Sequence, residues 1–136
     1  MTILIDLNVI LDVVQHREPH YTDSALLLSK IVEGTLDGVG PGHAITTIYY
    51  IVHRYVNRKR AETTVDWLLD QLEVVPAGES DFRTARQLPI DDFEDAVVAT
   101  LAKRASCDVI ATRNTADFED SPVPAKTPKA ILDNLQ

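Results

Sequence analysis

The mostly apolar run at residues 2–5, which ends in Asp6, constrains the fold more than any other part of the chain. The residues that follow it, 7–12, place apolar side chains at helical spacing, so the sequence predicts a strand that passes directly into a helix. A strand that is apolar on both faces is typical of the centre of a sheet covered by helices on both sides. Open α/β sheets bind ligands outside the carboxyl ends of their strands, so Asp6 is predicted to lie at a binding edge.

Two further acids occupy similar positions far along the chain. Asp95 lies in the acidic opening of a predicted helix, where Asp92 is the expected N-cap, and Asp117 follows a predicted strand across a short turn. Each acid alone is explained by capping or turn chemistry. Together they belong to one helix–strand–turn unit that could return beside the first strand. The sequence therefore predicts three carboxylates at one sheet edge, which is how an α/β fold assembles a divalent-metal site.

The rest of the chain alternates between helical and strand patterns. Asn8 is expected to cap the first helix and Gly34 to end the second. Strands separated by helices imply an α/β fold with a mostly parallel sheet and right-handed crossovers. The length of 136 residues predicts a single domain over residues 1–136. The pattern predicts strands at about residues 2–6, 37–42, 73–76 and 108–112, and helices at about 8–15, 22–33, 44–57, 60–72, 80–88, 92–105 and after Pro128.

The composition is acidic, with a formal net charge of −8 at pH 7. This charge makes the whole molecule unattractive to bulk nucleic acid, so any RNA contact must be local. Solubility explains the acidity, and so does a carboxylate cluster that holds a cation. No apolar stretch approaches the roughly 20 residues of a spanning helix, and no signal peptide is expected. The single cysteine, Cys107, cannot form an internal disulfide, so we expect a reducing, cytoplasmic compartment and no membrane association.

Four motifs, spread over essentially the whole chain in a fixed order, are shared with a known family. They occupy residues 5–12, 44–51, 92–96 and 112–118. With them the chain resembles the PIN-domain proteins, metal-dependent ribonucleases that include the VapC-type toxins of toxin–antitoxin pairs. The resemblance implies a three-layer α/β/α sandwich, a Mg²⁺ or Mn²⁺ cofactor, an RNA substrate, a cognate antitoxin and a homodimer. Carried over by position, Asp6, Asp95 and Asp117 resemble the family's catalytic, metal-binding acids, and Asn114 is a possible extra contact.

The chain departs from the family pattern at two positions. Thr47 stands where an acid is usual in relatives with a similar middle helix, and Leu7 stands where a small hydroxyl residue is common. A threonine hydroxyl can orient a metal-bound water but cannot neutralise the ion. Three outcomes remain open: weak one-metal catalysis, substitution by another acid such as Asp91 or Glu94, or a catalytically impaired module that binds RNA or a protein partner without cleavage.

The predicted middle helix carries a stripe of possible substrate contacts. Thr47, Tyr50, Arg54 and Arg58 fall at i, i+3, i+7 and i+11, which is one face of a continuous helix. Arginine binds phosphate bidentately and tyrosine stacks on an unpaired base, so the stripe predicts substrate binding. The alternative explanation is a core tyrosine and a solvated helix end whose arginines balance the dipole.

Other classes of site match the sequence less well. Phosphatases of the haloacid dehalogenase type also have an aspartate after the first strand, but their second acid is absent from Asp6-Leu7-Asn8. A receiver domain would need an acidic pair before the first helix, which the chain lacks. The four histidines do not have the spacing of a metal site, and His43 is expected at a helix start.

Overall fold

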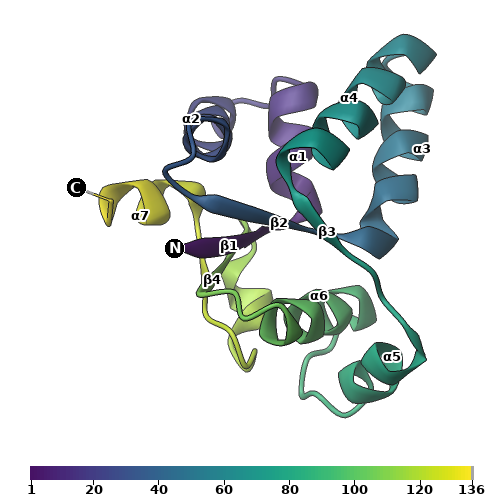
Figure 1. The fold of residues 1–136 in the computed structure, drawn as a ribbon, viewed down its shortest axis with the longest axis vertical. Helices are drawn as coiled ribbons and strands as arrows, with labels where there is room; N and C mark the ends of the chain where they lie inside the picture. Colours follow the sequence, from purple (N-terminus) through teal and green to yellow (C-terminus); the bar gives the residue numbers. More distant parts are fainter. Residues whose placement is uncertain (136) are drawn as a thin grey trace.

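Five short parallel strands form the central layer in the computed structural model, which describes residues 1–135 (Figure 1). They are β1 (Thr2–Ile5), β2 (Asp37–Pro41), β3 (Glu73–Val75), β4 (Val109–Ala111) and β5 (Ala125–Lys126). The order across the sheet is β3-β2-β1-β4-β5, and every neighbouring pair is parallel. The predicted parallel sheet is therefore confirmed, with the doubly apolar β1 at its centre.

Helices cover both faces of this sheet. They are α1 (Leu7–Val14), α2 (Tyr21–Val32), α3 (Ile45–Tyr55), α4 (Arg58–Gln71), α5 (Glu79–Ala85), α6 (Phe93–Arg104) and α7 (Pro128–Asp133), with 3-10 turns η1 (Gly42–Ala44) and η2 (Thr115–Phe118). Because side chains alternate along a strand, Ile3 and Ile5 join a core with α1 to α4, whereas Leu4 joins the opposite core with α6. Figure 1 shows α5 and α6 on one side of the sheet and α1 to α4 on the other. The predicted α/β/α sandwich is confirmed.

Helix α6 is buried along most of its length, which fixes the acids at its start. Residues 96–102 are all buried, and small alanines among them allow the helix to lie close to the sheet. At its other end, the Arg104 Nε donates to Asp81 Oδ1 of α5 over 2.8 Å. The Asp92 carboxylate accepts from the backbone N–H of Asp95 over 3.1 Å, which confirms Asp92 as the N-cap.

The predicted helix at residues 44–57 ends earlier than its periodicity suggested, and this removes Arg58 from the stripe. Helix α3 stops at Tyr55, and Asn57 caps the next helix by accepting from the backbone N–H of Arg60 over 2.8 Å. Arg58 is therefore the first residue of α4, so its placement on one face with Thr47 was wrong. The capping preference of asparagine overrode a helical pattern that seemed continuous.

Three smaller features complete the comparison with the sequence. Gly34 follows α2 with φ +84°, as expected for a glycine that ends a helix. Asn8 was expected to cap α1, but Asp6 does so by accepting from the Leu7 N–H. Strand β5 was missed, because its two residues are too short to produce a periodic signal. None of the described helices is long and apolar enough to cross a membrane.

Candidate functional site

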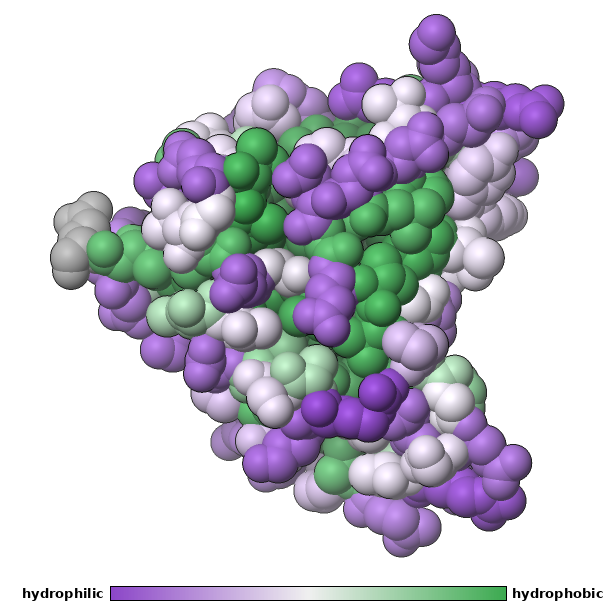
Figure 2. All heavy atoms as spheres, viewed as in Figure 1, coloured by the Kyte–Doolittle hydropathy of each residue, from purple (hydrophilic) through white to green (hydrophobic). Residues whose placement is uncertain are grey.

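The carboxyl ends of the strands gather the predicted acids at one edge of the sheet. Asp6 follows β1 directly, and its backbone N–H donates to the Ala111 carbonyl of β4 over 3.0 Å. Thr112 therefore comes beside Asp6, and the chain after β4 carries Asp117 in η2. Asp95 enters from the first turn of α6. In the space-filling view the molecule is indented between the part that holds α3 and α4 and the part that holds α5 and α6 (Figure 2).

The Asp6 carboxylate is held firmly by its neighbours. It is 6% exposed and accepts hydrogen bonds from the Leu7 N–H over 2.8 Å, the Thr112 hydroxyl over 2.8 Å and the Asn8 side-chain amide over 3.3 Å. Burial raises the pKa of Asp6 above its ordinary value, and the bonds from Thr112 and Leu7 oppose this shift. These hydrogen bonds hold the Asp6 carboxylate in a fixed orientation, in which its oxygens could act as metal ligands.

Asn8 joins the two strand ends that form this part of the site. Its side-chain amide donates to the Thr112 hydroxyl over 3.2 Å, and its Oδ1 accepts from the Arg113 N–H over 3.3 Å. The Thr112 hydroxyl also accepts from the Asn114 N–H over 3.1 Å. Asn8 thus positions Asp6 and the loop towards Asp117, a role that its assignment as a helix cap did not anticipate.

An ion pair between Arg113 and Asp12 holds the loop after β4 against α1. Arg113 Nε donates to Asp12 Oδ2 over 2.8 Å, and the Asp12 side chain is completely buried. The Ser24 hydroxyl donates to the same oxygen over 3.2 Å. The sequence signal for this pair was the acid at Asp12 within the buried face of α1, but its partner lies 101 residues away.

Asp95 is the least compensated of the three acids. Burial raises the pKa of Asp95 to about 7, and the negative charges of Asp92, Asp6, Asp117 and Glu94 add to the shift. Within residues 1–135, no donor hydrogen-bonds the Asp95 carboxylate. Asp117, although exposed, also raises the pKa of Asp6. The three acids predicted from the sequence therefore lie within electrostatic reach of one another, and no basic side chain of residues 1–135 offsets the raised pKa of Asp95.

This arrangement agrees with the comparison to known proteins. A family model described as PIN domain matches residues 2–116. The chain belongs to the PIN-domain family. The match includes Asp6 and Asp95 and ends one residue before Asp117. Ribonuclease VapC1 of Aquifex aeolicus (strain VF5) is 25% identical over 117 residues, which are 82% of this chain and 81% of that protein.

Solved PIN-domain structures have the same fold. VapBC2 from Rickettsia felis, bound to a DNA fragment from its promoter, gives a TM-score of 0.67 at 15% identity and covers 93% of this chain and 98% of that chain. VapC20 of Mycobacterium tuberculosis, described as a sarcin-ricin loop cleaving toxin, gives a TM-score of 0.70 at 10% identity and covers 85% and 92%. At these identities the likeness shows the fold alone.

The other predicted site residues divide between the acid edge and α3. Glu94 lies in the first turn of α6 and raises the pKa of Asp95, and Asp91 lines a neighbouring acidic cavity of about 370 Å³. Asn114 is exposed at the start of η2, and its backbone carbonyl accepts from the Asp117 N–H over 3.0 Å. These three residues are therefore close to the predicted metal-binding acids.

Helix α3 presents the remaining predicted residues from another direction. Thr47 is half-buried in the second position after the start of the helix, while Tyr50 and Arg54 are exposed further along it. Tyr50 and Arg54 line a shallow surface hollow, and the Arg54 guanidinium lies 5.7 Å from the centre of the Tyr55 ring. The structure thus keeps Tyr50 and Arg54 on one helix but not Arg58.

The acids of this PIN domain are of a type that binds a divalent cation, although their side chains do not form a complete set of ligands. No group of three or more His, Cys, Asp or Glu side chains in residues 1–135 is close enough to hold a metal ion as the side chains lie. Mg²⁺ is usually bound by one or two carboxylates and retains several waters, so it does not need such a cage. Asp95, whose charge is opposed by four other acids, is an oxygen donor that a cation would stabilise. The donor set therefore fits a hydrated Mg²⁺ or Mn²⁺ ion.

His43 is an unexpected neighbour of the acids. It lies in η1, at the start of the helical segment that leads into α3, as the sequence predicted. Both ring nitrogens are buried and have no hydrogen-bond partner among the described residues. Burial lowers the pKa of His43, while the charges of Glu94 and Asp6 oppose the shift. The imidazole thus lies within electrostatic reach of Glu94 and Asp6, which its sequence context alone did not indicate.

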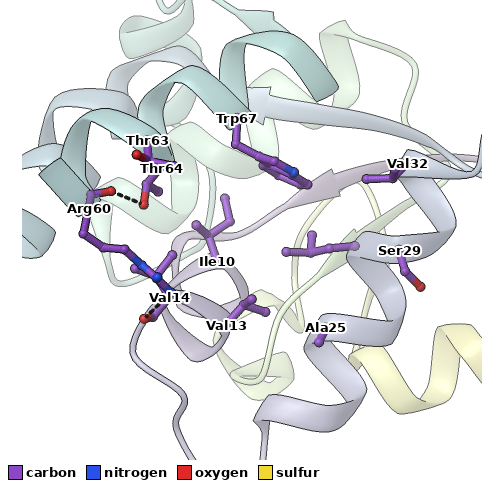
Figure 3. Close-up of a pocket in the computed structure, with 11 residues that line it drawn as sticks. Ile10, Val13, Val14, Ala25, Ser29, Val32, Arg60, Thr63, Thr64 and Trp67 are labelled. Carbon is purple, nitrogen blue, oxygen red and sulfur yellow. Dashed lines mark hydrogen bonds between the residues drawn. The ribbon is translucent and has the colours of Figure 1, made fainter.

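An apolar groove forms a second surface feature, between α1, α2 and α4. Its volume is about 340 Å³, and Ile10, Leu28 and Trp67 are among its lining residues (Figure 3). At its rim, the Arg60 guanidinium donates to the Val14 carbonyl over 3.4 Å. No acid is among the residues that line this groove within the described part of the chain, so it suits apolar side chains rather than a cation.

Proposed function

We propose that this PIN-domain protein is a metal-dependent endoribonuclease that hydrolyses RNA phosphodiester bonds, and that it is the toxin of a type II toxin–antitoxin pair. The observation that carries the proposal is the convergence of Asp6, Asp95 and Asp117 at the carboxyl ends of the strands, where burial and the neighbouring acids raise the pKa of Asp95 to about 7. Such a site gains most from a bound cation. The similarity to Ribonuclease VapC1 supports the choice of substrate.

The residues of this chain have distinct tasks in such a reaction. Asp6, Asp95 and Asp117 would hold Mg²⁺ or Mn²⁺, which lowers the pKa of a bound water and polarises a phosphoryl oxygen. Thr112 and the Leu7 N–H keep the Asp6 carboxylate oriented by hydrogen bonds of 2.8 Å each. They also oppose the rise in the pKa of Asp6, and so favour the ionised carboxylate that a cation would bind.

Residues outside the acid group would bind and position the substrate. Arg54 would hold a phosphate and Tyr50 would stack on a base, since both side chains are exposed on α3. Thr47 would orient a water through its hydroxyl. Asn114 would add a contact beside Asp117. Arg58 keeps a role only as part of the positive start of α4, where it pairs with Glu62 over 3.4 Å.

An antitoxin partner, a homodimer and a cytoplasmic location belong to the same proposal. The resemblance to VapC-type toxins supports the partner, and FitAcB from Neisseria gonorrhoeae and VapBC-1 from nontypeable Haemophilus influenzae have the same fold. The apolar groove beside Trp67 offers a surface for the apolar side chains of such a partner. The same antitoxin would also cover the acid edge.

The test is cleavage of a mixed-sequence single-stranded RNA by the purified protein, with Mg²⁺ or Mn²⁺ and with a chelator. Asp95→Asn should abolish cleavage, whereas Asp133→Asn should leave it unchanged, because Asp133 is an exposed acid paired with Lys129 on α7. A folded wild-type protein that does not cut, or cutting that survives Asp95→Asn, would overturn the proposal.

A second candidate is a PIN module that binds RNA or a protein without cutting, and Thr47 is the observation that favours it. Relatives of this pattern usually have an acid at the position of Thr47. A threonine there adds no negative charge. If this candidate is correct, wild-type protein should bind Mn²⁺ weakly and Thr47→Asp should both tighten metal binding and create cleavage. Calorimetric titration with Mn²⁺ measures the first effect independently of the second. Equal cleavage by both proteins would reject this candidate.

A further inference from the structure

The imidazole of His43 is buried without a partner in the folded chain. Both ring nitrogens are buried, and neither forms a hydrogen bond with any of residues 1–135. A neutral imidazole has one N–H donor and one acceptor nitrogen, and a buried polar group without a partner costs stability. Because nearly all buried polar groups in native proteins are satisfied, this exception points to a partner from outside the chain.

The fold places His43 at the same sheet edge as the acids. In the parallel register of β1 and β2, Leu4 lies beside Val39. Asp6 is therefore level with Pro41, the last residue of β2, and His43 follows two residues later in η1. The imidazole thus belongs to the carboxyl ends of the strands, where an α/β sheet binds its ligands.

Close packing fixes the turn that carries this imidazole. A Cβ on Gly42 would lie 2.9 Å from the Val75 carbonyl oxygen, so a glycine is needed where this turn approaches the end of β3. On the other side of His43, Ala44 is buried. The backbone that presents the imidazole is therefore held on both sides, as a residue that positions a ligand requires.

The acids nearby determine which partner suits the imidazole. Burial lowers the pKa of His43 from its ordinary value of 6.5, so the ring is neutral at neutral pH, while the charges of Glu94 and Asp6 oppose this shift. The same two charges repel a phosphate and attract a cation with its bound waters. A water bound to a cation is more acidic than bulk water, so it is a strong donor to the acceptor nitrogen of a neutral imidazole.

We propose that His43 is a positioning residue of the metal site, whose acceptor nitrogen holds a water of the hydrated Mg²⁺ or Mn²⁺ ion. The proposal deepens the proposed nuclease function and rests on its metal site. Contact through a water fits this edge, because no three His, Cys, Asp or Glu side chains of residues 1–135 are close enough to hold an ion directly. Groups that contact a metal only indirectly commonly change its affinity 10- to 100-fold.

The first test measures metal binding without cleavage. Mn²⁺ is titrated calorimetrically into wild-type protein, His43→Ala, His43→Asn and His43→Gln. His43→Ala should weaken Mn²⁺ binding about 10-fold. The asparagine and glutamine variants place a carbonyl acceptor near the positions of Nδ1 and Nε2, so one of them should restore most of the affinity. His53→Ala is the matched control, because His53 is an exposed histidine of α3, and it should bind Mn²⁺ as wild type does.

Thermal unfolding separates this role from a structural one. His43→Leu replaces the unpartnered imidazole by an apolar side chain of similar size, so the metal-free variant should have a Tm equal to or above that of wild type. The increase in Tm that Mn²⁺ gives wild-type protein should shrink in this variant. A lower Tm without metal, together with unchanged Mn²⁺ affinity, would mean that the fold itself uses the imidazole, and the proposal would be wrong.

The outcomes also distinguish this proposal from the nuclease proposal. Mn²⁺ binding that is lost in Asp95→Asn but unchanged in His43→Ala would overturn the role of His43 and leave the metal site standing. Mn²⁺ binding that weakens in His43→Ala, in a wild-type protein that cuts no RNA, would do the reverse. In an active enzyme, His43→Ala should need about 10-fold more Mn²⁺ for half-maximal cleavage. A slower reaction at saturating Mn²⁺ with unchanged Mn²⁺ affinity would place His43 in the chemical step and overturn its role in metal binding.

Discussion

The two halves of the acid edge are built in opposite ways. At Asp6, three groups donate to one buried carboxylate: the Thr112 hydroxyl, the Asn8 side-chain amide and the Leu7 N–H. At Asp95, burial and the charges of four other acids raise the pKa to about 7. The protein itself supplies hydrogen-bond donors to the Asp6 carboxylate. The Asp95 carboxylate has no such donor among the described residues.

This difference indicates which part of the site is structural support and which part gains from a ligand. Hydrogen bonds orient the Asp6 carboxylate before anything binds, so an approaching cation would find this ligand already in position. Asp95 and Asp117 lie at the more open side, where repulsion among carboxylates is relieved only by a cation or by protons. Changes in the first half should therefore damage the fold, whereas changes in the second should improve it and damage function.

The largest expected loss of stability is at the ion pair beneath the Asp6 half. Arg113→Ala should lower the free energy of unfolding by about 3–5 kcal/mol, because it leaves the completely buried Asp12 carboxylate without its cation. Urea denaturation measures this change. Lys129→Ala is the control, because it breaks an exposed pair with Asp133 and should cost less than about 1 kcal/mol. Similar losses in both variants would show that the Asp6 half is not specially supported.

A smaller loss is expected when Asp6 loses one donor. Thr112→Val keeps the shape of a fully buried side chain and removes its hydroxyl, so it should cost about 1–3 kcal/mol at neutral pH. The loss should shrink in acid, because a protonated Asp6 has less need of the donor and the variant raises the pKa of Asp6 further. NMR titration of the Asp6 carboxyl tests the shift.

Thr100→Val is the matched control for this change. Thr100 is also buried, but its hydroxyl donates only to the Ala96 carbonyl of its own helix, over 2.8 Å. Thr100→Val should lower the free energy of unfolding by less than about 1 kcal/mol, and this change should not depend on the protonation of Asp6. A Thr112→Val effect no larger than that of Thr100→Val would contradict the special role of the Asp6 hydrogen bonds.

The contrast between the two halves also explains what the sequence could predict. The apolar strand before Asp6 and the acidic helix start at Asp95 are local patterns, so the central strand and the three acids could be placed from the sequence. Arg113 and Asp12 are 101 residues apart, and only the register of β1 against β4 brings them together. The supporting half of the site was therefore missed, although the acids themselves were identified.

The misplacement of Arg58 has a different physical cause. Periodicity alone could not show where the middle helix ends, because residues 47, 50, 54 and 58 keep the helical spacing in sequence whether or not the helix continues to residue 58. The decision rests on one hydrogen bond, from the Arg60 N–H to the Asn57 side chain. Such a local competition between capping and continuation is a matter of about 1 kcal/mol, which a pattern does not resolve.

The smallest expected effect has the opposite sign and lies in the Asp95 half. In the folded protein the pKa of Asp95 is about 7, above its ordinary value of 3.8. Stability from this group is therefore fully present below about pH 4 and is lost as the pH rises to about 7. An asparagine side chain carries no charge at any pH, so Asp95→Asn should stabilise the metal-free protein at pH 8 and should have no such effect near pH 4.

The gain should be on the order of 1 kcal/mol, because solvent screens a carboxylate that is only partly buried. In thermal unfolding this corresponds to an increase of roughly 3–5 °C in Tm at pH 8. The His43 imidazole titrates in both proteins, so its contribution cancels in the difference. Addition of Mn²⁺ should then reverse the order, because the ion binds and stabilises wild-type protein but has lost a ligand in Asp95→Asn. A variant that is less stable than wild type without metal would mean that Asp95 is held by the fold, as Asp6 is, and the two halves would no longer differ.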